Sequence, residues 1–369
     1  MSERYIGLIS GTSMDAIDAA LVEFGEGLCQ IVATHSHPIA KETLEGLRLI
    51  VDHPDHVALD KLGQLDVLLG REFATAANEL IRSSGADPAG ISAIGSHGQT
   101  VYHAPGGAVP FTMQLADPNV IAQETGITTV ADFRRRDVAV GGQGAPLVPA
   151  FHQAVFGDSL EPRAVCNIGG IANLSLMIPG QTLSGFDTGP GNALMDAWTR
   201  LQRGRSHDQD GKWAASAEPD EKLLSTLLEY EYFDRPAPKS TGIEEFNLAW
   251  LQKRLDGLPR PVSPPVVQST LCQLTAETIA TSLTRSCPQA GALYLCGGGA
   301  HNNTLVARLK ARLGDWRLET TDALGLGVDW VEAAAFAWLA SRTMTGLAGN
   351  VPEVTGARSE VVLGGVYPA

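Results

Sequence analysis

Cysteine is scarce in this chain, and the cysteines present are scattered. There are five, an odd number, with no C-x-x-C pair: Cys29, Cys166, Cys272, Cys287 and Cys296. A disulfide framework needs paired cysteines and a zinc site of this kind needs clustered ones, so the sequence disfavours both. Such use of cysteine is typical of a reducing compartment, and we expect a cytoplasmic protein.

Long apolar runs and an excess of positive charge are also missing. No uninterrupted apolar stretch reaches about 18 residues, and the N-terminal MSERYIGLIS lacks a basic region followed by an apolar signal core. Lys and Arg number 27 against 41 Asp and Glu, which gives a net charge of −14. Nucleic acid and anionic membranes are bound by clustered Lys and Arg, so we expect neither as a partner.

Glycine is the residue present in excess. Forty of the 369 residues are glycine, about 11% where about 7% is average. The length predicts two domains, each able to bury a sizeable core. Short apolar strands mixed with long periodic helical stretches indicate an α/β fold.

Two predicted β-hairpins have small, glycine-containing tips. The first joins strands 5–9 and 17–24 through SGTSMD, and the second joins strands 164–168 and 171–178 through Gly169 and Gly170. Such turns expose backbone N–H groups with no Cβ in the way, and these groups bind phosphate well. An ordinary tight turn is the alternative for SGTSMD taken alone. Two similar hairpins about half a chain apart suggest an old duplication.

A third glycine-rich turn follows a predicted strand at 292–296. Gly297, Gly298 and Gly299 lead there into a predicted helix at 305–313, which would let the backbone approach a flat ring or a ribose closely. No G-x-x-x-x-G-K-[ST] phosphate loop occurs, and Gly189-Pro190-Gly191 lacks the third glycine of a dinucleotide fingerprint. Further helices are predicted at 59–83 (with the apolar spacing broken at Gly70), 192–203, 220–230, 269–286 and 329–341, the last with Asp329 as its cap.

The stretch GFDTGPGN places Asp187 at a predicted strand end before a glycine-rich turn and a helix. Ligands of α/β folds bind at such strand ends, so Asp187 is a candidate general base. A capping role for this Asp is the structural alternative. An aspartic protease would need two facing D-[ST]-G triads, and the chain has one and long helices.

Three consecutive arginines stand in ADFRRRDVAVGGQGAP, in an otherwise acidic chain. Guanidinium groups suit bidentate capture of carboxylate or phosphate. Arg134 and Arg136 are the better candidates, because Arg135 is expected to point away from both. A solvated turn with local Asp partners is the alternative.

The histidines carry weaker signals. The pairs His35/His37 and His53/His56 have spacings that a metal could use, but neither has a third ligand nearby in sequence. His97, in SHGQT at a predicted strand end, could contact a substrate or could simply be hydrogen-bonded in a turn. No G-x-S-x-G or H-E-x-x-H motif appears, which disfavours hydrolases and metallopeptidases. Glu332, near the start of an apolar helix, could face a ligand or act as a helix-dipole partner.

Taken together, these motifs make the chain resemble the anhydro-N-acetylmuramic acid kinase family over nearly its whole length. The stretches that carry the resemblance are GLISGTSMDAIDAALV, SHGQTVYHAP, ADFRRRDVAVGGQGAPLVPAFH, CNIGGIANLS, GFDTGPGNALMDAW, PKSTGIEEFN, LCGGGAHN, VEAAAFAWLA and VPEVTGARSEVVLGGVYP. The resemblance implies the two-lobed, duplicated α/β fold of the actin, hexokinase and Hsp70-like ATPases, related to ribonuclease H, with an ATP cleft between the lobes. We expect residues 1–133 in the N-terminal lobe, joined by the tail 353–369, and residues 134–352 in the C-terminal lobe.

The same resemblance implies the activity. Such kinases use ATP and Mg²⁺ to open 1,6-anhydro-N-acetylmuramic acid with water and to phosphorylate O6, which gives N-acetylmuramic acid 6-phosphate and ADP in cell-wall recycling. The family also suggests a homodimer.

Site residues follow from the same stretches. The family's ATP motif falls on Gly11, Thr12, Ser13, Met14, Asp15, Ala16, Ile17 and Asp18, with Gly169 and Gly170 as the second phosphate loop and Gly297, Gly298 and Gly299 on the nucleoside side. The catalytic carboxylate falls on Asp187. The expected sugar-binding residues are Ser96, His97, Arg134, Arg136 and Glu332.

Two positions depart from the pattern expected for these proteins. Ala16 stands where the family's turn usually has glycine, and Ile9 stands where many superfamily members have an Asp two residues before the first-loop glycine. The metal ligands are therefore left open, with Asp15 and, through water, Asp187 as candidates. Two other functions stay open on sequence: a nucleotide-driven chaperone or filament subunit of this fold, and a kinase of a related anhydro sugar such as levoglucosan.

Overall fold

The protein forms two compact units, which are described here one at a time. The computed structural model describes residues 2–11, 14, 16–25 and 27–369. Unit 1 comprises Met1–Val155 and Trp330–Ala369, and unit 2 comprises Phe156–Asp329. These limits differ from the expected lobe boundaries at 133/134 and 352/353, because residues 134–155 and 330–352 lie with unit 1.

A six-stranded mixed sheet is the centre of unit 1, with the strand order β13-β7-β4-β1-β2-β3. Strands β1, β2 and β3 are antiparallel neighbours, whereas β4 is parallel to β1 and β7 is parallel to β4. A separate two-stranded sheet pairs β5 with β6. The strands are β1 (Glu3–Ser10), β2 (Ala16–Gly25), β3 (Leu28–Pro38), β4 (Ile91–Ser96), β5 (Gln99–Ala104), β6 (Phe111–Leu115), β7 (Thr129–Ala131) and β13 (Gly365–Tyr367).

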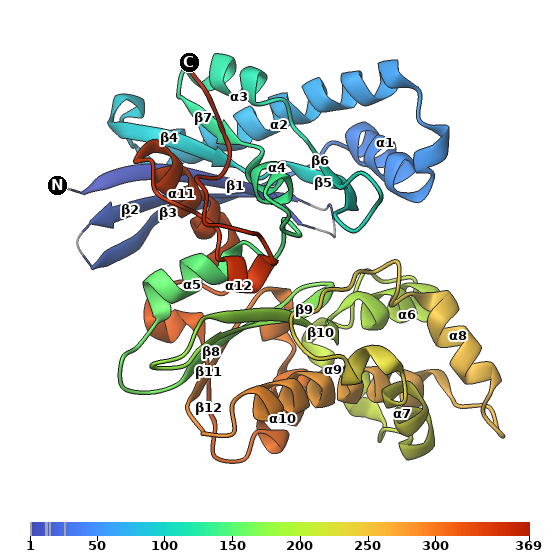
Figure 1. The fold of residues 1–369 in the computed structure, drawn as a ribbon. Helices are drawn as coiled ribbons and strands as arrows, with labels where there is room; N and C mark the ends of the chain where they lie inside the picture. Colours follow the sequence, from blue (N-terminus) through green and yellow to red (C-terminus); the bar gives the residue numbers. More distant parts are fainter. Residues whose placement is uncertain (1, 12–13, 15, 26) are drawn as a thin grey trace. The chain divides into compact units, whose positions relative to one another are not determined.

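Two long helices, α2 and α11, cover opposite faces of this sheet (Figure 1). The helices of unit 1 are α1 (Lys41–Asp52), α2 (Leu59–Ser84), α3 (Pro118–Thr125), α4 (Phe133–Ala139), α5 (Val148–Phe156), α11 (Val331–Met344) and α12 (Pro352–Thr355), with short 3-10 turns η1 (Pro54–His56) and η2 (Pro88–Gly90). Ile6 and Leu8 point toward α2 and share its apolar core with Phe73. The alternate residue, Gly7, meets α11.

Glycine at two sheet positions lets α11 lie directly on the strands. A Cβ on Gly7 would lie 1.8 Å from the carbonyl oxygen of Ala333, and a Cβ on Gly95 would lie 2.1 Å from that of Phe336. No side chain larger than hydrogen fits at either place unless the helix moves. This contact explains why α11, late in the sequence, folds with the N-terminal strands.

Unit 2 contains a five-stranded mixed sheet with the order β10-β9-β8-β11-β12. Its strands are β8 (Arg163–Ile168), β9 (Ile171–Met177), β10 (Ser184–Pro190), β11 (Ala292–Cys296) and β12 (Arg317–Thr320). Its helices are α6 (Ala193–Arg203), α7 (Glu221–Leu228), α8 (Leu248–Asp256), α9 (Pro264–Ser286) and α10 (Asn303–Arg312), and its 3-10 turns are η3 (Gln209–Gly211), η4 (Ala214–Ser216), η5 (Glu231–Asp234), η6 (Gly298–His301) and η7 (Thr321–Leu324). Helices α9 and α10 lie side by side (Figure 1), and the buried face of α9 contributes Leu271, Leu274 and Ile279 to the core of this unit.

The two sheets share one topology. In each, three consecutive antiparallel strands form a meander, the next strand pairs in parallel with the first of the three, and another parallel strand follows. Thus β3-β2-β1-β4-β7 corresponds to β10-β9-β8-β11-β12. The predicted hairpins are β1–β2 and β8–β9, the first two strands of each meander, which supports the expected duplication.

The predicted helices are present, with shifted ends. The helix predicted at 269–286 begins earlier, at Pro264, and the apolar break at Gly70 does not interrupt α2. A Cβ on Gly70 would lie 3.0 Å from the carbonyl oxygen of Asp117, so glycine there gives α3 room to approach. The prediction that Asp329 caps the last of these helices was wrong. Trp330 occupies the N-cap position of α11, and no side chain caps this helix. Asp329 instead lies 2.9 Å from Nε2 of His301. Among the described residues, no helix combines the length and the apolar composition needed to cross a lipid bilayer.

Candidate active site

The first predicted phosphate turn connects β1 to β2 in unit 1. Thr12, Ser13 and Asp15 lie outside the described residues. Gly11 is exposed with open space where a Cβ would be, and its carbonyl oxygen accepts a 3.1 Å hydrogen bond from the N–H of Met14. Met14 takes the left-handed backbone, with φ of 55°.

The remaining residues of this motif belong to β2. Ala16 is a strand residue opposite Pro38, so alanine at this position needs no left-handed backbone. Ile17 is buried in the core, and the carboxylate of Asp18 accepts a 2.9 Å hydrogen bond from Ser36. Residues 16–18 of the predicted motif therefore belong to strand β2. In the described part of the turn, Gly11 is the residue of the motif that is exposed.

Ser96 and His97 follow at the end of β4, next to the end of β1. The N–H of His97 donates to the carbonyl oxygen of Leu8 at 2.9 Å, which holds this strand end against β1. Ser96 is buried, and within the described part of the chain its Oγ has no hydrogen-bond partner. A buried hydroxyl without a partner in the protein is one that a bound molecule or water can satisfy.

Arg134 lies against His97, and their contacts define the state of the imidazole. His97 Nδ1 donates to the carbonyl oxygen of Gly98 at 2.8 Å, so Nε2 is left as the acceptor for the Nε–H of Arg134 at 2.9 Å. Burial, together with the nearby Arg134 charge, lowers the pKa of His97 well below its ordinary value. His97 is therefore neutral at physiological pH and positions the arginine. Arg134 Nη1 also donates to the carbonyl oxygen of Gly144 at 2.7 Å.

The three arginines of α4 have different surroundings. Arg135 forms a 3.0 Å ion pair with Asp132 and, together with Ser96 and His97, lines a pocket of about 140 Å³ in unit 1. Arg136 is exposed and does not line that pocket. The structure thus brings Ser96, His97 and Arg134 together and leaves Arg136 apart from them.

A buried carboxylate that the sequence did not single out organises the segment after these arginines. Asp137 is fully buried, and its Oδ1 accepts 2.8 Å hydrogen bonds from Asn350 and Thr355. Its Oδ2 accepts a 2.7 Å hydrogen bond from the N–H of Gly144. Asp137 therefore joins α4, the glycine-rich loop and the C-terminal segment of unit 1. The sequence analysis assigned a role to the arginines before Asp137 and none to Asp137 itself. No pattern of neighbouring residues indicates hydrogen-bond partners more than 200 positions away.

Glu332 is in the first turn of α11 and is half-buried. The residue after it, Ala333, lies against Gly7 of β1, as does Ala337 one turn later. The helix start that carries Glu332 is thus fixed against the strand that leads to the first turn.

In unit 2, the second predicted phosphate turn is bound to the start of α6. The N–H of Asn192 donates to the carbonyl oxygen of Gly169 at 2.8 Å, and the N–H groups of Gly191 and Ala193 donate to that of Gly170 at 2.9 and 3.1 Å. A Cβ on Gly191 would lie 2.3 Å from the Gly169 oxygen. The carbonyl oxygens of the turn therefore accept hydrogen bonds from the residues that begin α6. Only glycine fits at position 191, because a Cβ there would collide with the turn.

The third glycine turn packs against the same strand end. Gly297 has a φ of 77°, and a Cβ there would lie 2.2 Å from Asn167 Oδ1. A Cβ on Gly299 would lie 2.2 Å from Ile168 Cγ2, whereas Gly298 is exposed. The two predicted glycine turns of unit 2 thus meet at the end of β8.

Asp187 lies in β10, beside a bulge that separates it from Gly189. Its Oδ2 accepts a 3.0 Å hydrogen bond from the N–H of Thr241, and its own N–H donates to the carbonyl oxygen of Lys239 at 3.0 Å. Tyr232 Oη donates to the Asp187 carbonyl oxygen at 2.9 Å. The side chain is half-buried and is oriented by backbone groups, as a positioned base requires.

The segment that holds Asp187 contains residues that were not among the predicted site residues. Lys239 Nζ donates to the carbonyl oxygens of Tyr232 and Phe233 at 3.2 and 3.3 Å and lies 4.7 Å from the centre of the Tyr232 ring. Burial lowers the pKa of Lys239. The stretch PKSTG was among those that carried the family resemblance, and this was the signal that it positions the site.

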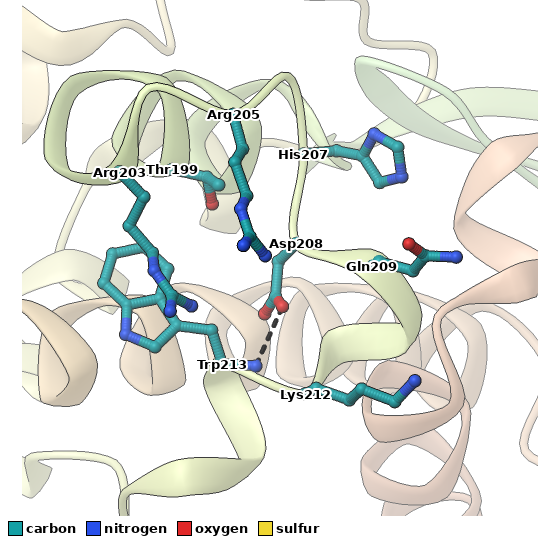
Figure 2. A pocket seen from close by; sticks show the side chains of 8 residues that line it. All are labelled: Thr199, Arg203, Arg205, His207, Asp208, Gln209, Lys212 and Trp213. Carbon is teal, nitrogen blue, oxygen red and sulfur yellow. Dashed lines mark hydrogen bonds between the residues drawn. The ribbon is translucent and has the colours of Figure 1, made fainter.

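A further pocket of unit 2 contains none of the predicted residues. It has a volume of about 230 Å³ and is lined by Thr199, Arg203, Arg205, His207, Asp208, Gln209, Lys212 and Trp213 (Figure 2). Asp208 holds the loop, since its Oδ1 and Oδ2 accept 2.8 Å hydrogen bonds from the N–H groups of Trp213 and Ala214. Figure 2 shows the Arg205 side chain extending toward Asp208, and Arg203 lies 5.1 Å from the Trp213 ring.

This basic pocket adjoins the third glycine turn through α10. Thr304 Oγ1 donates to the carbonyl oxygen of Gly211 at 2.9 Å, and a Cβ on Gly211 would lie 2.1 Å from Asn302 Oδ1. Asn302 follows the glycines and caps α10. The sequence analysis did not single out these residues, because no motif with a known spacing marks them.

Comparison with known proteins gives a full-length match. The family model described as "AnmK: Anhydro-N-acetylmuramic acid kinase" matches residues 3–369. A Coxiella burnetii protein called anhydro-N-acetylmuramic acid kinase is 49% identical over 367 residues, which cover 99% of this chain and 97% of that one. One of the same name from Shewanella halifaxensis is 50% identical over 368 residues, covering 99% and 98%.

One solved structure resembles the chain at low sequence identity. Component A of (R)-2-hydroxyglutaryl-CoA dehydratase from Acidaminococcus fermentans is 10% identical, with a TM-score of 0.48, over 91% of this chain and 96% of that chain.

Proposed function

The chain belongs to the anhydro-N-acetylmuramic acid kinase family, and we propose that it phosphorylates O6 of 1,6-anhydro-N-acetylmuramic acid with ATP while water opens the anhydro ring. It is a sugar kinase with the α/β fold of the actin, hexokinase and Hsp70-like ATPases, with one mixed sheet in each unit. The products are N-acetylmuramic acid 6-phosphate and ADP, and the process served is peptidoglycan recycling.

The observation that carries the proposed chemistry is the orientation of Asp187. Its carboxylate accepts a hydrogen bond from the Thr241 N–H. Asp187 itself lies in β10, and Gly191, the residue after this strand, donates to the carbonyl oxygen of Gly170 in the second predicted phosphate turn. A carboxylate oriented by a backbone N–H, near a glycine-rich turn that we propose to bind phosphate, is suited to deprotonate a nucleophile next to a polyphosphate.

We assign the nucleotide to backbone groups more than to lysines. Gly11 in unit 1, and Gly169, Gly170, Gly297, Gly298 and Gly299 in unit 2, are the proposed contacts. Backbone N–H groups stabilise phosphoryl oxygens without any net charge, which explains how a chain of net charge −14 can bind ATP. The basic pocket around Arg205 and Lys212 adds positive charge beside the third glycine turn.

The residues fit a Mg²⁺ ion in its preferred chemistry. Mg²⁺ binds oxygen ligands and keeps several waters, so one carboxylate and the ATP phosphates suffice to hold it. Asp187 would supply such a carboxylate through water, and the other candidate, Asp15, is outside the described residues. When bound, Mg²⁺ neutralises charge that develops on the transferring phosphoryl group.

Arg134 is the proposed partner of the lactyl carboxylate of the sugar. His97 and Gly144 fix the direction of its guanidinium, and the buried Ser96 hydroxyl lies at the same strand end as His97. Arg136 and Glu332 are kept as further proposed sugar contacts. A pre-oriented guanidinium binds a carboxylate with less loss of side-chain entropy than a free one.

Asp187 removes a proton from a water whose oxygen bonds to the anomeric carbon, and the bond from that carbon to O6 breaks. O6 then bonds to the γ-phosphorus of ATP as the bond to the bridging oxygen of ADP breaks. The proton on Asp187 passes to solvent, and anhydro sugar, ATP and water become sugar 6-phosphate and ADP.

The test is ADP release by the purified protein with Mg²⁺ and ATP, with and without the anhydro sugar, followed by mass analysis of the product. Asp187→Asn should lower kcat at least about a thousandfold, since it removes the general base and keeps the shape. Asp234→Asn, a surface carboxylate of the same unit that is 78% exposed, should leave kcat unchanged.

Two substrate controls separate the alternatives. A chaperone or filament subunit would release ADP at the same rate without the sugar. A levoglucosan kinase would accept levoglucosan, which lacks the lactyl group, with equal kcat/KM. Full turnover by Asp187→Asn would contradict the assigned chemistry.

We also propose that the enzyme is cytoplasmic and a homodimer. The structure forms no disulfide among the five cysteines, four of which are buried, as suits a reducing compartment. Light scattering of the purified protein tests the dimer, for which a mass near 39.0 kDa would be the contrary result.

A further inference from the structure

Two histidines and a glutamate converge on the surface of unit 1, in a region that the proposed kinase reaction does not use. His35 and His37 lie two residues apart on β3, so both side chains point to the face covered by α2. Glu79 of α2 meets them there: His35 Nε2 and His37 Nδ1 lie 2.8 and 3.1 Å from Glu79 Oε2. One ligand atom from each of the three residues lies within 4.8 Å of the other two.

We propose that His35, His37 and Glu79 form a binding site for one Zn²⁺ ion, distinct from the Mg²⁺–ATP chemistry of the kinase. Two imidazole nitrogens and one carboxylate oxygen are a common Zn²⁺ ligand set, with a fourth position open to water. Mg²⁺ prefers oxygen ligands alone and is a poor match for this site.

The spacing suits the ion. Ligand atoms at about 2.0–2.1 Å from a tetrahedral Zn²⁺ are separated by about 3.3 Å. The two nitrogen–oxygen distances of 2.8 and 3.1 Å are close to this, so small rotations of the side chains admit the metal. The metal would replace two hydrogen bonds that now converge on one oxygen.

Access and second-sphere contacts also fit a bound ion. The side chains of His35, His37 and Glu79 are 27%, 20% and 32% exposed, so solvent reaches the site while the backbone that carries it is fixed. Glu79 Oε1 contacts Arg82 Nη2 at 3.5 Å, and that arginine is 77% exposed and free to turn away.

The fold gives this site a physical role. β3 is an edge strand, paired only with β2 in the six-stranded sheet, and the three ligands connect it to α2 across 42 residues of sequence. An ion that binds only the folded state stabilises that state, so Zn²⁺ would fasten the sheet edge to its covering helix.

The experiment uses the full chain, purified without a histidine tag and treated with EDTA. Titration with ZnCl₂, followed by a competing colorimetric chelator, should give one ion per chain with micromolar or tighter affinity and a rise of several degrees in the thermal midpoint. Excess Mg²⁺ should not compete. Co²⁺ in place of Zn²⁺ should give the visible absorption of a four-coordinate ion.

Variants locate the ion. His37→Gln and Glu79→Gln should each weaken Zn²⁺ binding at least about tenfold and abolish the thermal shift, while kinase turnover with Mg²⁺ stays unchanged. The double variant His53→Gln/His56→Gln is the matched control, because that histidine pair is exposed and belongs to no three-ligand cluster among the described residues. Cys29→Ser checks that the half-buried thiol on the same strand is not the ligand.

Absence of Zn²⁺ binding at 100 µM would overturn the proposal, as would unchanged binding in both His37→Gln and Glu79→Gln. Neither outcome bears on the proposed kinase activity, because both are measurements of Zn²⁺ binding and not of turnover.

Discussion

The Nε–H of Arg134 donates a 2.9 Å hydrogen bond to Nε2 of His97, a ring nitrogen that is free to accept because Nδ1 donates to the Gly98 carbonyl. A buried neutral imidazole thus fixes a guanidinium. The relationship bears directly on sugar binding, since an arginine with a fixed orientation recognises a carboxylate by direction as well as by charge.

Replacing Arg134 by alanine should raise the KM for the anhydro sugar about tenfold or more and leave the KM for ATP unchanged. A hydrogen bond to a charged group contributes about 1.5–3 kcal/mol, and 1.4 kcal/mol is tenfold in affinity. His97→Phe, which removes the acceptor but keeps the ring, should raise the sugar KM by a smaller factor. Steady-state kinetics with each substrate varied in turn measures both effects.

Arg48→Ala serves as the control for this pair, because Arg48 is an exposed arginine of α1 and is none of the proposed sugar contacts. Its effect on the sugar KM should be below about twofold, as for a surface substitution away from special contacts. An unchanged sugar KM in Arg134→Ala would remove the arginine from the proposed site.

A methyl group at Gly7 should destabilise unit 1 strongly. Its Cβ would lie 1.8 Å from the carbonyl oxygen of Ala333, so α11 must move away from β1, and overpacking of this kind costs about 1–3 kcal/mol or more. Gly63→Ala is the matched control, because an added Cβ there meets nothing within 4 Å and alanine favours the exposed helix by up to about 1 kcal/mol. Urea unfolding should give a lower midpoint for Gly7→Ala and an equal or higher one for Gly63→Ala.

Loss of the Asp137 carboxylate should loosen the C-terminal segment. Asp137→Ala leaves the donors on Gly144, Asn350 and Thr355 without their acceptor in a buried place, at a cost of about 3 kcal/mol or more. Limited proteolysis should then cut near residues 350–360 faster than in the unaltered protein. Asp60→Asn, on the exposed start of α2, should change the free energy of unfolding by about 0.5 kcal/mol at most and leave the cleavage rate unchanged. Equal protease resistance in Asp137→Ala would contradict the expectation.

Acid should destabilise the protein through buried neutral histidines. Burial lowers the pKa of His152 from its ordinary value of 6.5 to about 3, so the unfolded chain takes up a proton below pH 6.5 that the folded chain refuses. Stability therefore falls as the pH drops from 6.5 toward 3, by up to about 1.4 kcal/mol per pH unit for this one group. Burial also lowers the pKa of His97 well below its ordinary value, so His97 acts in the same direction.

The measurement is the free energy of unfolding in urea at several pH values from 8 to 4.5. His152→Gln cannot take up a proton, so its stability should depend less steeply on pH below 6.5, whatever its absolute stability. His207→Gln, an exposed histidine of unit 2, should keep the original slope. Identical slopes for His152→Gln and the unaltered protein would show that another group is responsible.

The local structure of the chain could be read from residue patterns. Alternation of apolar residues around SGTSMD predicted the hairpin β1–β2, and the periodic run before Gly85 predicted α2 almost to its end. Asp187 was found because a glycine-rich turn follows it directly. Each of these signals arises from residues a few positions apart, which is the range over which turns, strands and helices form their own hydrogen bonds.

Contacts between distant segments could not be read in this way. Thr241, which orients Asp187, is 54 residues from it, and Asn350 is 213 residues from Asp137. Asp329 has the sequence position of a helix cap, yet the fold brings it to His301 instead. Spacing along the chain carries no information on such pairs.

Residue patterns alone were enough to predict the two hairpins, the longer helices, the glycine turns and the kinase family, because these depend on local backbone preferences and on ordered motifs. Only the tertiary structure decided that α11 closes on Gly7 and Gly95, that His97 orients Arg134, and that Glu79 joins His35 and His37. The physical reason is that these contacts depend on which faces of the sheets the helices cover, and that follows from the packing of the whole unit.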